Sequence, residues 1–219
     1  MGYTFINMKI KGVIFDLDGV ICSTDEFHYL AWKTIADDEG IYFDKSINNR
    51  LRGVSRMDSL NIILENAKRE YSEEEKTELA NTKNEIYKKY LERMSPKDVD
   101  SSVTKTLKEL KSRNIKIAIG SSSKNTKTIL KQVGLISEFD AIADGNDITH
   151  SKPNPEVFLV AAKKLHLEPR ECIVVEDAFA GIDAANAGKF ISVGIGDASK
   201  YKKADYKINN IYEILDIIE

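Results

Sequence analysis

The chain has 219 residues, of which 42% are hydrophobic and 31% are charged, and its formal net charge is -3. This length suits one large domain, or one domain carrying a smaller inserted one. The charge balance gives no basic surface for nucleic acid, and no apolar run is long enough to span a bilayer. Cys22 and Cys172 are far apart and lack metal-ligand spacing, which fits a reducing cytoplasm. We therefore expect a cytoplasmic protein that has no signal peptide, binds no nucleic acid and does not contact a membrane.

The first expected strand covers residues 13–16 and follows a predicted extension at residues 1–7. Asp16 and Asp18 stand at its end, with only Leu17 between them and Gly19 directly after. In a strand-like conformation, side chains at i and i+2 point to the same side. One carboxylate can therefore attack a substrate while the other moves a proton.

A long segment without strand signals follows. Residues 24–39 predict a helix that ends at Gly40, and Ser55-Arg56-Met57-Asp58 and Ser72-Glu73-Glu74-Glu75 resemble capping boxes, each opening a further helix. Ser95-Pro96-Lys97-Asp98 ends the last helix. About seventy residues of helix inserted after the first strand predict a separate small lobe.

Strands and helices then alternate to the end of the chain. The expected strands cover 115–120, 141–143, 172–175 and 191–193, and the expected helices cover 103–112, 126–133, 156–166 and 181–187. Asn154-Pro155 predicts the start of the third of these helices, and Gly134 and Gly188 predict helix ends. This alternation predicts an α/β core, a Rossmann-like parallel sheet covered on both faces.

Polar groups follow the ends of the expected strands, where ligands bind in open parallel sheets. They are Asp16 with Asp18, Ser121, Lys152, and Glu176 with Asp177. A single Asp at a strand end is about as often a turn or helix cap. Four groups meeting at one sheet edge favour an active site.

Four motifs carry a family resemblance. Asp16-Leu17-Asp18-Gly19-Val20, Ser121, Lys152-Pro153 and Glu176-Asp177 resemble those of the haloacid dehalogenase-like phosphotransferases. Their order is similar to the subgroup whose helical cap follows the first strand, which implies a core of residues 1–22 and 96–219 and a cap of residues 23–95. Further segments look like those of the β-phosphoglucomutases: His28, Trp32, 53–56, 58–60, 121–125 and 140–144.

The chemistry suits phosphoryl transfer. Asp16 as nucleophile would form an aspartyl phosphate, and Asp18 would act as general acid and base. Lys152 and Ser121 would bind the transferring phosphoryl group. Asp16, Asp177 and Glu176 suit Mg²⁺, and the resemblance implies that the backbone carbonyl of Asp18 completes the ligand set.

The cap resemblance implies the substrate. Arg56, with Ser123, Lys124 and Asn125, would bind the non-transferring phosphate, although Arg56 also fits a surface charge near a helix start. His28 and Trp32 share a helix face with Thr24. The resemblance places His28 against Asp18, while both His28 and Trp32 also fit a core role. The remaining expected substrate-binding residues are Gly53, Val54, Ser59, Lys83 and Ser122.

The resemblance therefore implies an isomerase that interconverts β-D-glucose 1-phosphate and glucose 6-phosphate through β-glucose 1,6-bisphosphate. A Mg²⁺-dependent sugar-phosphate phosphatase is the alternative, because both reactions use the same core residues. A non-catalytic phosphate-binding module is disfavoured, since binding alone gives no reason for Asp18 beside Asp16. We expect a monomer that acts on small sugar phosphates.

Overall fold

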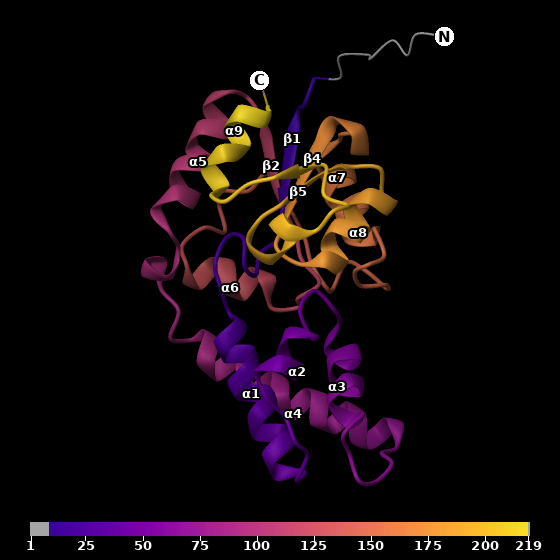
Figure 1. Ribbon diagram of the computed structural model, residues 1–219. Coiled ribbons are helices and arrows are strands. Elements are labelled where there is room, and N and C mark those ends of the chain that lie inside the picture. The colour runs from indigo at the N-terminus through magenta and orange to yellow at the C-terminus, as the bar shows by residue number, and fades with distance from the viewer. Residues whose placement is uncertain (1–8, 219) are drawn as a thin grey trace, which may run out of the picture.

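The computed structural model describes residues 9–218, so the predicted extension at residues 1–7 lies outside the described part. Figure 1 shows an α/β core and, below it, a group of helices. The core contains one sheet in the order β3-β2-β1-β4-β5-β6, in which every neighbouring pair is parallel. Its strands are β1 (Gly12–Phe15), β2 (Lys116–Gly120), β3 (Ala141–Ala143), β4 (Cys172–Glu176), β5 (Ile191–Gly194) and β6 (Tyr206–Lys207). The predicted α/β parallel-sheet fold is confirmed.

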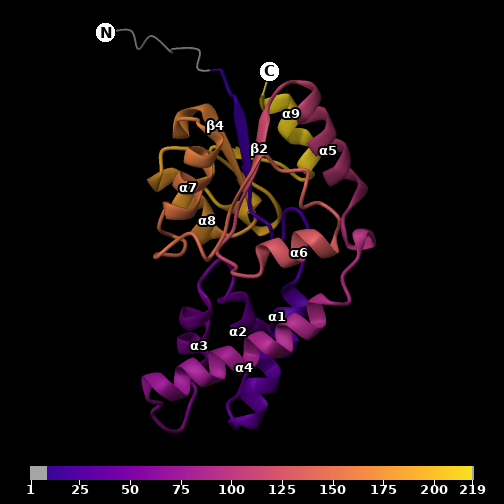
Figure 2. The ribbon, with the colours of Figure 1, turned by 180° about the vertical axis from the view of Figure 1, so that it is seen from behind.

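Helices cover both faces of this sheet (Figure 2). One face packs against α5 (Ser101–Ser112), α6 (Thr126–Gln132) and α9 (Ile214–Ile217), and the other against α7 (Glu156–Leu165) and α8 (Phe179–Ala187). The central strand β1 explains this layering, because Val13 and Phe15 face the first layer, Ile14 faces the second, and all three are fully buried. A strand covered on both faces needs a continuous apolar run.

The helical group comprises α1 (Asp25–Asp38), α2 (Lys45–Asn49), α3 (Arg56–Leu64) and α4 (Glu73–Leu91), and we call it the cap. It has a core of its own that includes Trp32, Leu60 and Ile63. Ser72 and Glu75 form the expected reciprocal capping box at the start of α4. The division of the chain at residues 22/23 and 95/96 stays a prediction. No helix among residues 9–218 is both long and apolar enough to cross a membrane.

Among the α-helices and strands, three short ones have no counterpart in the sequence prediction: α2, β6 and α9. They have five, two and four residues, and such lengths carry too few periods of a hydrophobic pattern to be recognised. Helix α7 begins at Glu156, the start of the expected range, with Pro155 rather than Asn154 at its N-cap position. Asn154 Oδ1 still accepts the Glu156 N–H at 3.0 Å.

The two glycines predicted to end helices differ from each other. Gly134 follows α6 with a φ of 75°, as a left-handed helix terminator does. Gly188 has a φ of -78°, and the left-handed residue is Lys189, with a φ of 64°. Gly188 is instead required by packing, because a Cβ there would lie 2.6 Å from the Phe190 ring.

Candidate active site

The carboxyl ends of the central strands bring the predicted core residues together. Asp16 follows β1, Ser121 follows β2, Glu176 ends β4 and Asp177 follows it, while Lys152 lies in the loop after β3. Parallel pairing of β1 with both β2 and β4 places these ends side by side. The local turn after β1 depends on Gly19, which has a φ of 84° and whose Cβ, if present, would overlap the Asp177 carboxylate.

Lys152 is the positive centre of this edge. Its side chain is buried and forms ion pairs with Asp16 Oδ1, at 2.5 Å, and with Glu176 Oε1. Burial alone would lower the pKa of Lys152, but the charges of Asp16 and Glu176 outweigh it and raise that pKa above its ordinary value. The ammonium group therefore stays charged beside the aspartate expected to attack phosphorus.

Three carboxylates gather at the same place: Asp16, Glu176 and Asp177 each offer one oxygen, and these oxygens lie within 4.8 Å of one another. Burial, followed by the charges of Glu176, Asp16 and Asp18, raises the pKa of Asp177 to about 9. Burial also raises the pKa of Glu176 to about 7, with Lys152 opposing and Asp16 adding to the shift. Carboxylates held this close repel one another, so the group is stabilised when one of them binds a proton or when all three bind a cation.

The donor set fits a hard divalent cation such as Mg²⁺, which prefers carboxylate and carbonyl oxygens. Among residues 9–218, no donor bonds to the backbone carbonyl of Asp18, the fourth ligand implied by the resemblance. Glu176 is less available than Asp177, since its Oε1 contacts Lys152 and its Oε2 accepts the Ala178 N–H at 3.0 Å. Asp16 and Asp177 are thus the better placed ligands.

Asp18 is held by the start of the cap. Its Oδ1 accepts the Thr24 N–H at 2.6 Å, and its Oδ2 accepts the Thr24 hydroxyl at 2.5 Å. Tyr87 of α4 donates its own hydroxyl to Thr24 Oγ1 at 2.8 Å. Burial raises the pKa of Asp18 to about 6, the Thr24 bonds oppose this, and the charges of Asp25 and Asp16 add to it. A carboxyl group near this pKa can both donate and accept a proton near neutral pH.

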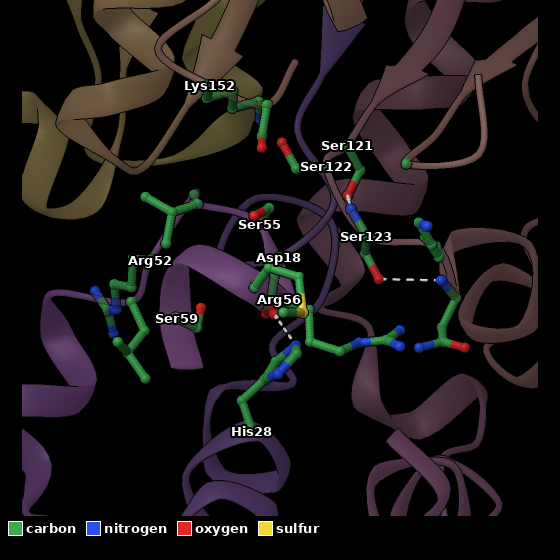
Figure 3. A pocket seen from close by; sticks show the side chains of 18 of the residues that line it. Asp18, His28, Arg52, Ser55, Arg56, Ser59, Ser121, Ser122, Ser123 and Lys152 are labelled. Atoms are coloured by element: carbon green, nitrogen blue, oxygen red, sulfur yellow. Dashed lines mark hydrogen bonds and ion pairs between the residues drawn. The ribbon is translucent and has the colours of Figure 1, made fainter. Parts of the chain in front are cut away.

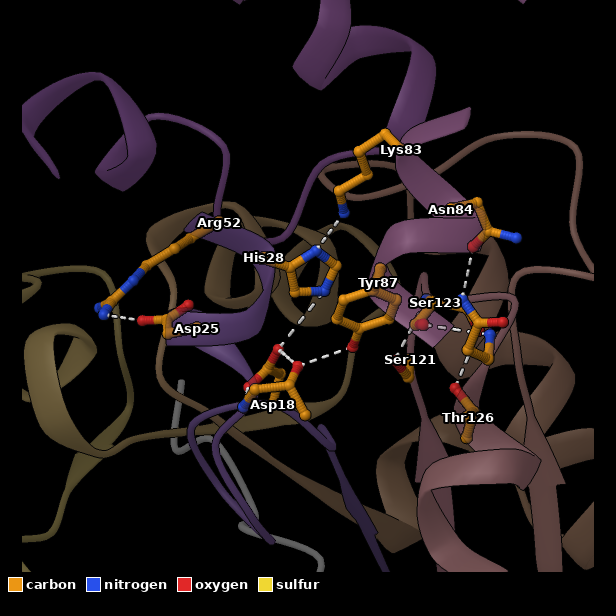
Figure 4. A network of polar contacts seen from close by, with 12 residues as sticks. Asp18, Asp25, His28, Arg52, Lys83, Asn84, Tyr87, Ser121, Ser123 and Thr126 are labelled. Carbon is orange, nitrogen blue, oxygen red and sulfur yellow. Dashed lines mark hydrogen bonds and ion pairs between the residues drawn. The ribbon is translucent and has the colours of Figure 1, made fainter. Parts of the chain in front are cut away.

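His28 and Lys83 connect the cap to Asp18 (Figure 4). His28 Nε2 lies 3.8 Å from Asp18 Oδ2, and Lys83 Nζ lies 2.7 Å from His28 Nδ1. The imidazole stacks on Tyr87 with ring centroids 4.1 Å apart, and Lys83 lies over the rings of Tyr87 and Trp32. Burial, then the charges of Lys83 and Arg56, lowers the pKa of His28, so the ring is neutral at pH 7.

A second set of donors lies away from the acidic edge. Arg56, the first residue of α3, donates to Asn84 Oδ1 at 2.8 Å, and Asn125, which precedes α6, donates to the same oxygen at 2.9 Å. Ser123 Oγ accepts the Asn125 N–H at 3.2 Å, while Ser121 Oγ accepts the Ser123 N–H at 3.2 Å. The serine loop thus connects the acidic edge to this second set.

One cavity of about 390 Å³ between core and cap joins the two sets (Figure 3). Every residue predicted for the site lines it: Asp16, Asp18, His28, Trp32, Gly53, Val54, Arg56, Ser59, Lys83, Ser121, Ser122, Ser123, Lys124, Asn125, Lys152, Glu176 and Asp177. The core side carries the carboxylates and Lys152, and the cap side carries His28, Lys83 and Arg56.

Asn84, Tyr87 and Arg52 are polar residues of this site that were not predicted from the sequence. Asn84 and Tyr87 share with Lys83 the inner side of α4, where all three are buried in a helix otherwise rich in exposed charge. Arg52 forms ion pairs with Asp25 of the cap and, at 3.2 Å, with Asp197 of the core. The only signal was the i, i+1, i+4 spacing of polar residues on α4, which is common on solvated helices.

Comparison with known proteins gives concordant results. The family model described as haloacid dehalogenase-like hydrolase matches residues 10–189. β-Phosphoglucomutase of Bacillus subtilis is 40% identical over 94% of this chain and 92% of its own length. The crystal structure of β-phosphoglucomutase from Clostridium difficile superposes with a TM-score of 0.90 at 41% identity, covering 95% of this chain and 96% of that one. A phosphorylated carbohydrates phosphatase of Thermotoga maritima is 26% identical over 81% of each chain.

Proposed function

Since the chain belongs to the haloacid dehalogenase-like hydrolase family, we propose that it is a phosphomutase that interconverts β-D-glucose 1-phosphate and glucose 6-phosphate. The observation that supports this proposal is one cavity with a cationic side chain at each end. Lys152 and Ser121 stand at one end and Arg56 and Asn125 at the other. A bisphosphate of a hexose has one phosphate for each end.

The reaction divides into two displacements at phosphorus. An Asp16 oxygen attacks the phosphate of β-glucose 1,6-bisphosphate, the P–O bond to the sugar breaks, and Asp18 gives its proton to the leaving sugar oxygen. When the C1 phosphate has been transferred, glucose 6-phosphate leaves and β-glucose 1-phosphate binds with its C6 hydroxyl at phosphorylated Asp16. Asp18 removes the proton of that hydroxyl, and its oxygen takes the phosphoryl group from Asp16. The new bisphosphate turns around in the cavity, so that its C1 phosphate faces Asp16 for the next round. Each half-reaction conserves one phosphoryl group and one proton, so the bisphosphate is regenerated.

The remaining residues of the core stabilise charge. Lys152 faces the oxygen of Asp16 and would bind the transferring phosphoryl oxygens, to which Ser121 would donate a hydrogen bond. Mg²⁺ held by Asp16, Asp177, the Asp18 carbonyl and Glu176 would offset the negative charge of nucleophile and phosphate. Trp32 is buried, and its ring lies against the Lys83 ammonium group. Its proposed role is to hold Lys83 in place rather than to contact the sugar directly.

The cap has to favour a sugar over water. Gly53 and Val54 lie on the cap loop over the acidic edge, where Gly53 approaches Ala178 of the core, and Ser59 offers a hydroxyl to the sugar. Lys124, beside Ser123, would add its charge to the distal phosphate. Because Asp18 contacts both Thr24 and His28, the acid/base group is complete only with the cap in place.

The test is to incubate the protein with Mg²⁺, β-glucose 1-phosphate and a trace of β-glucose 1,6-bisphosphate, and to measure glucose 6-phosphate against free phosphate. A mutase gives glucose 6-phosphate in large excess and needs the bisphosphate. The phosphatase named among the relatives makes hydrolysis the second candidate. Free phosphate as the main product would select it.

A further inference from the structure

The side-chain oxygen of Asn84 joins the cap to the core. Asn84 lies on α4, is 9% exposed, and accepts one hydrogen bond from Arg56 of the cap and one from Asn125 of the core, at 2.8 and 2.9 Å. Figure 4 shows Asn84 at this boundary, one residue after Lys83. The two donors come from segments 69 residues apart, as counted from 56 to 125.

The chemistry of the partners fixes the orientation of both amides. A guanidinium group only donates, so Asn84 must present its carbonyl oxygen to Arg56. With that oxygen as acceptor, Asn125 must present its NH₂ group. The Asn84 oxygen then uses both of its lone pairs, while Arg56 and Asn125 each keep further N–H groups for an anion. A neutral acceptor also leaves the positive charge of Arg56 available to that anion.

We propose that Asn84 is a positioning residue that assembles the distal-phosphate site from both lobes. The inference rests on the proposed function, because it takes Arg56 and Asn125 as the ligands of the non-transferring phosphate. Asn84 holds these donors at one point before substrate arrives, which lowers the cost of ordering them during binding. Its place beside Lys83 on α4 means that the helix fixed at the distal site also carries the Lys83–His28 contact to Asp18.

The test is a double-mutant cycle with Asn84→Ala and Arg56→Ala, measured as kcat/KM for β-glucose 1-phosphate. Asn84→Ala alone should lose about 10- to 100-fold, the range for a buried hydrogen bond to a charged donor. In the Arg56→Ala background the same substitution should cost less than in the wild type, because Asn84 then holds only Asn125. The matched control is Asn61→Ala, an exposed asparagine on α3, which should stay within about twofold of the wild type.

Two further measurements separate this role from a general structural one. Phosphoenzyme formation from acetyl phosphate, which has no distal phosphate, should change less than about threefold in Asn84→Ala. The affinity for glucose 6-phosphate, measured by calorimetry, does not depend on turnover. It therefore tests the role of Asn84 even if the wild type proves to be a phosphatase. Equal glucose 6-phosphate affinity in wild type and Asn84→Ala, or full additivity in the cycle, would overturn the proposal. Wild type without isomerisation but with weakened binding in Asn84→Ala would overturn the mutase assignment alone.

Discussion

The ammonium group of Lys83 lies 2.7 Å from Nδ1 of His28, inside the cap, and Lys83 is only 2% exposed. While Lys83 carries its charge, its ammonium group can only donate, so Nδ1 of His28 accepts and the ring proton sits on Nε2. That proton points toward Asp18 Oδ2, 3.8 Å away. A buried lysine thereby sets the tautomer of the histidine that faces the acid/base carboxylate.

Lys83→Met should lower activity and change the pH dependence of stability. Burial, followed by the charge of Arg56, lowers the pKa of Lys83, whereas the unfolded chain keeps the ordinary value near 10.5. Folding therefore disfavours the charged lysine at low pH, and this penalty fades as pH rises from the folded to the unfolded pKa. The variant should gain stability relative to wild type at pH 6 and lose that advantage by pH 10.

Urea unfolding of both proteins across this pH range measures the difference. We also expect kcat to fall about 10- to 100-fold, since the His28 tautomer is no longer set. The control is Lys89→Met, on an exposed position of the same helix, which should leave kcat unchanged. A stability difference for Lys83→Met that does not vary with pH would mean that folding does not disfavour the charged lysine.

Asp16→Asn should abolish turnover while leaving the fold intact. The amide keeps the size of the carboxylate but is a poor nucleophile, so kcat should fall by about 10³-fold or more. Mass spectrometry after treatment with acetyl phosphate should detect a phosphorylated wild type and an unmodified variant. Turnover of Asp16→Asn near that of wild type would rule out the aspartyl phosphate.

Chelation should remove activity and Mg²⁺ should restore it. Asp177→Ala should raise the Mg²⁺ concentration for half-maximal activity by about tenfold or more, because it removes a carboxylate that, among residues 9–218, forms no ion pair with a lysine. Glu176→Gln should shift this concentration less and lower kcat instead, since Glu176 mainly contacts Lys152 and the Ala178 N–H. Magnesium titrations of the wild type and the two variants test this prediction. Equal shifts in both variants would mean that Glu176 binds Mg²⁺ as directly as Asp177 does.

Much of this architecture could be predicted from residue order. The buried strands gave clear apolar runs, and their carboxyl ends located Asp16, Ser121 and Asp177 because parallel strands align their ends. Lys83 was harder to predict, because its helix carries many exposed Lys and Glu residues. Which of them is buried depends on the tertiary structure. Asn84 could not be found at all, because both of its hydrogen-bond partners come from other elements.

Arg56→Ala should separate the two phosphate sites functionally. Binding energy at the distal phosphate helps close the cap over a sugar, so sugar-dependent turnover should fall about 100-fold or more. Phosphoenzyme formation from acetyl phosphate should fall far less. Both rates are measured on one protein preparation: sugar-dependent turnover by a coupled assay, and phosphoenzyme formation by chemical quench. Equal losses would show that Arg56 is structural and would favour the phosphatase.

The ion pair between Arg52 and Asp197 should affect closure weakly and only at low salt. It crosses from cap to core at 3.2 Å, but Asp197 is 62% exposed, and exposed pairs contribute about 1 kcal/mol or less. Asp197→Asn should therefore raise KM for β-glucose 1-phosphate by about two- to fivefold at low ionic strength. Asp197 also contacts Lys200 within the core, so Lys200→Ala is the matched control and should leave KM unchanged. Near 1 M salt the Debye length falls to about 3 Å, and the KM of Asp197→Asn should then equal that of wild type. A difference that persists at high salt would mean that Asp197 acts through packing of its loop rather than through charge across the lobes.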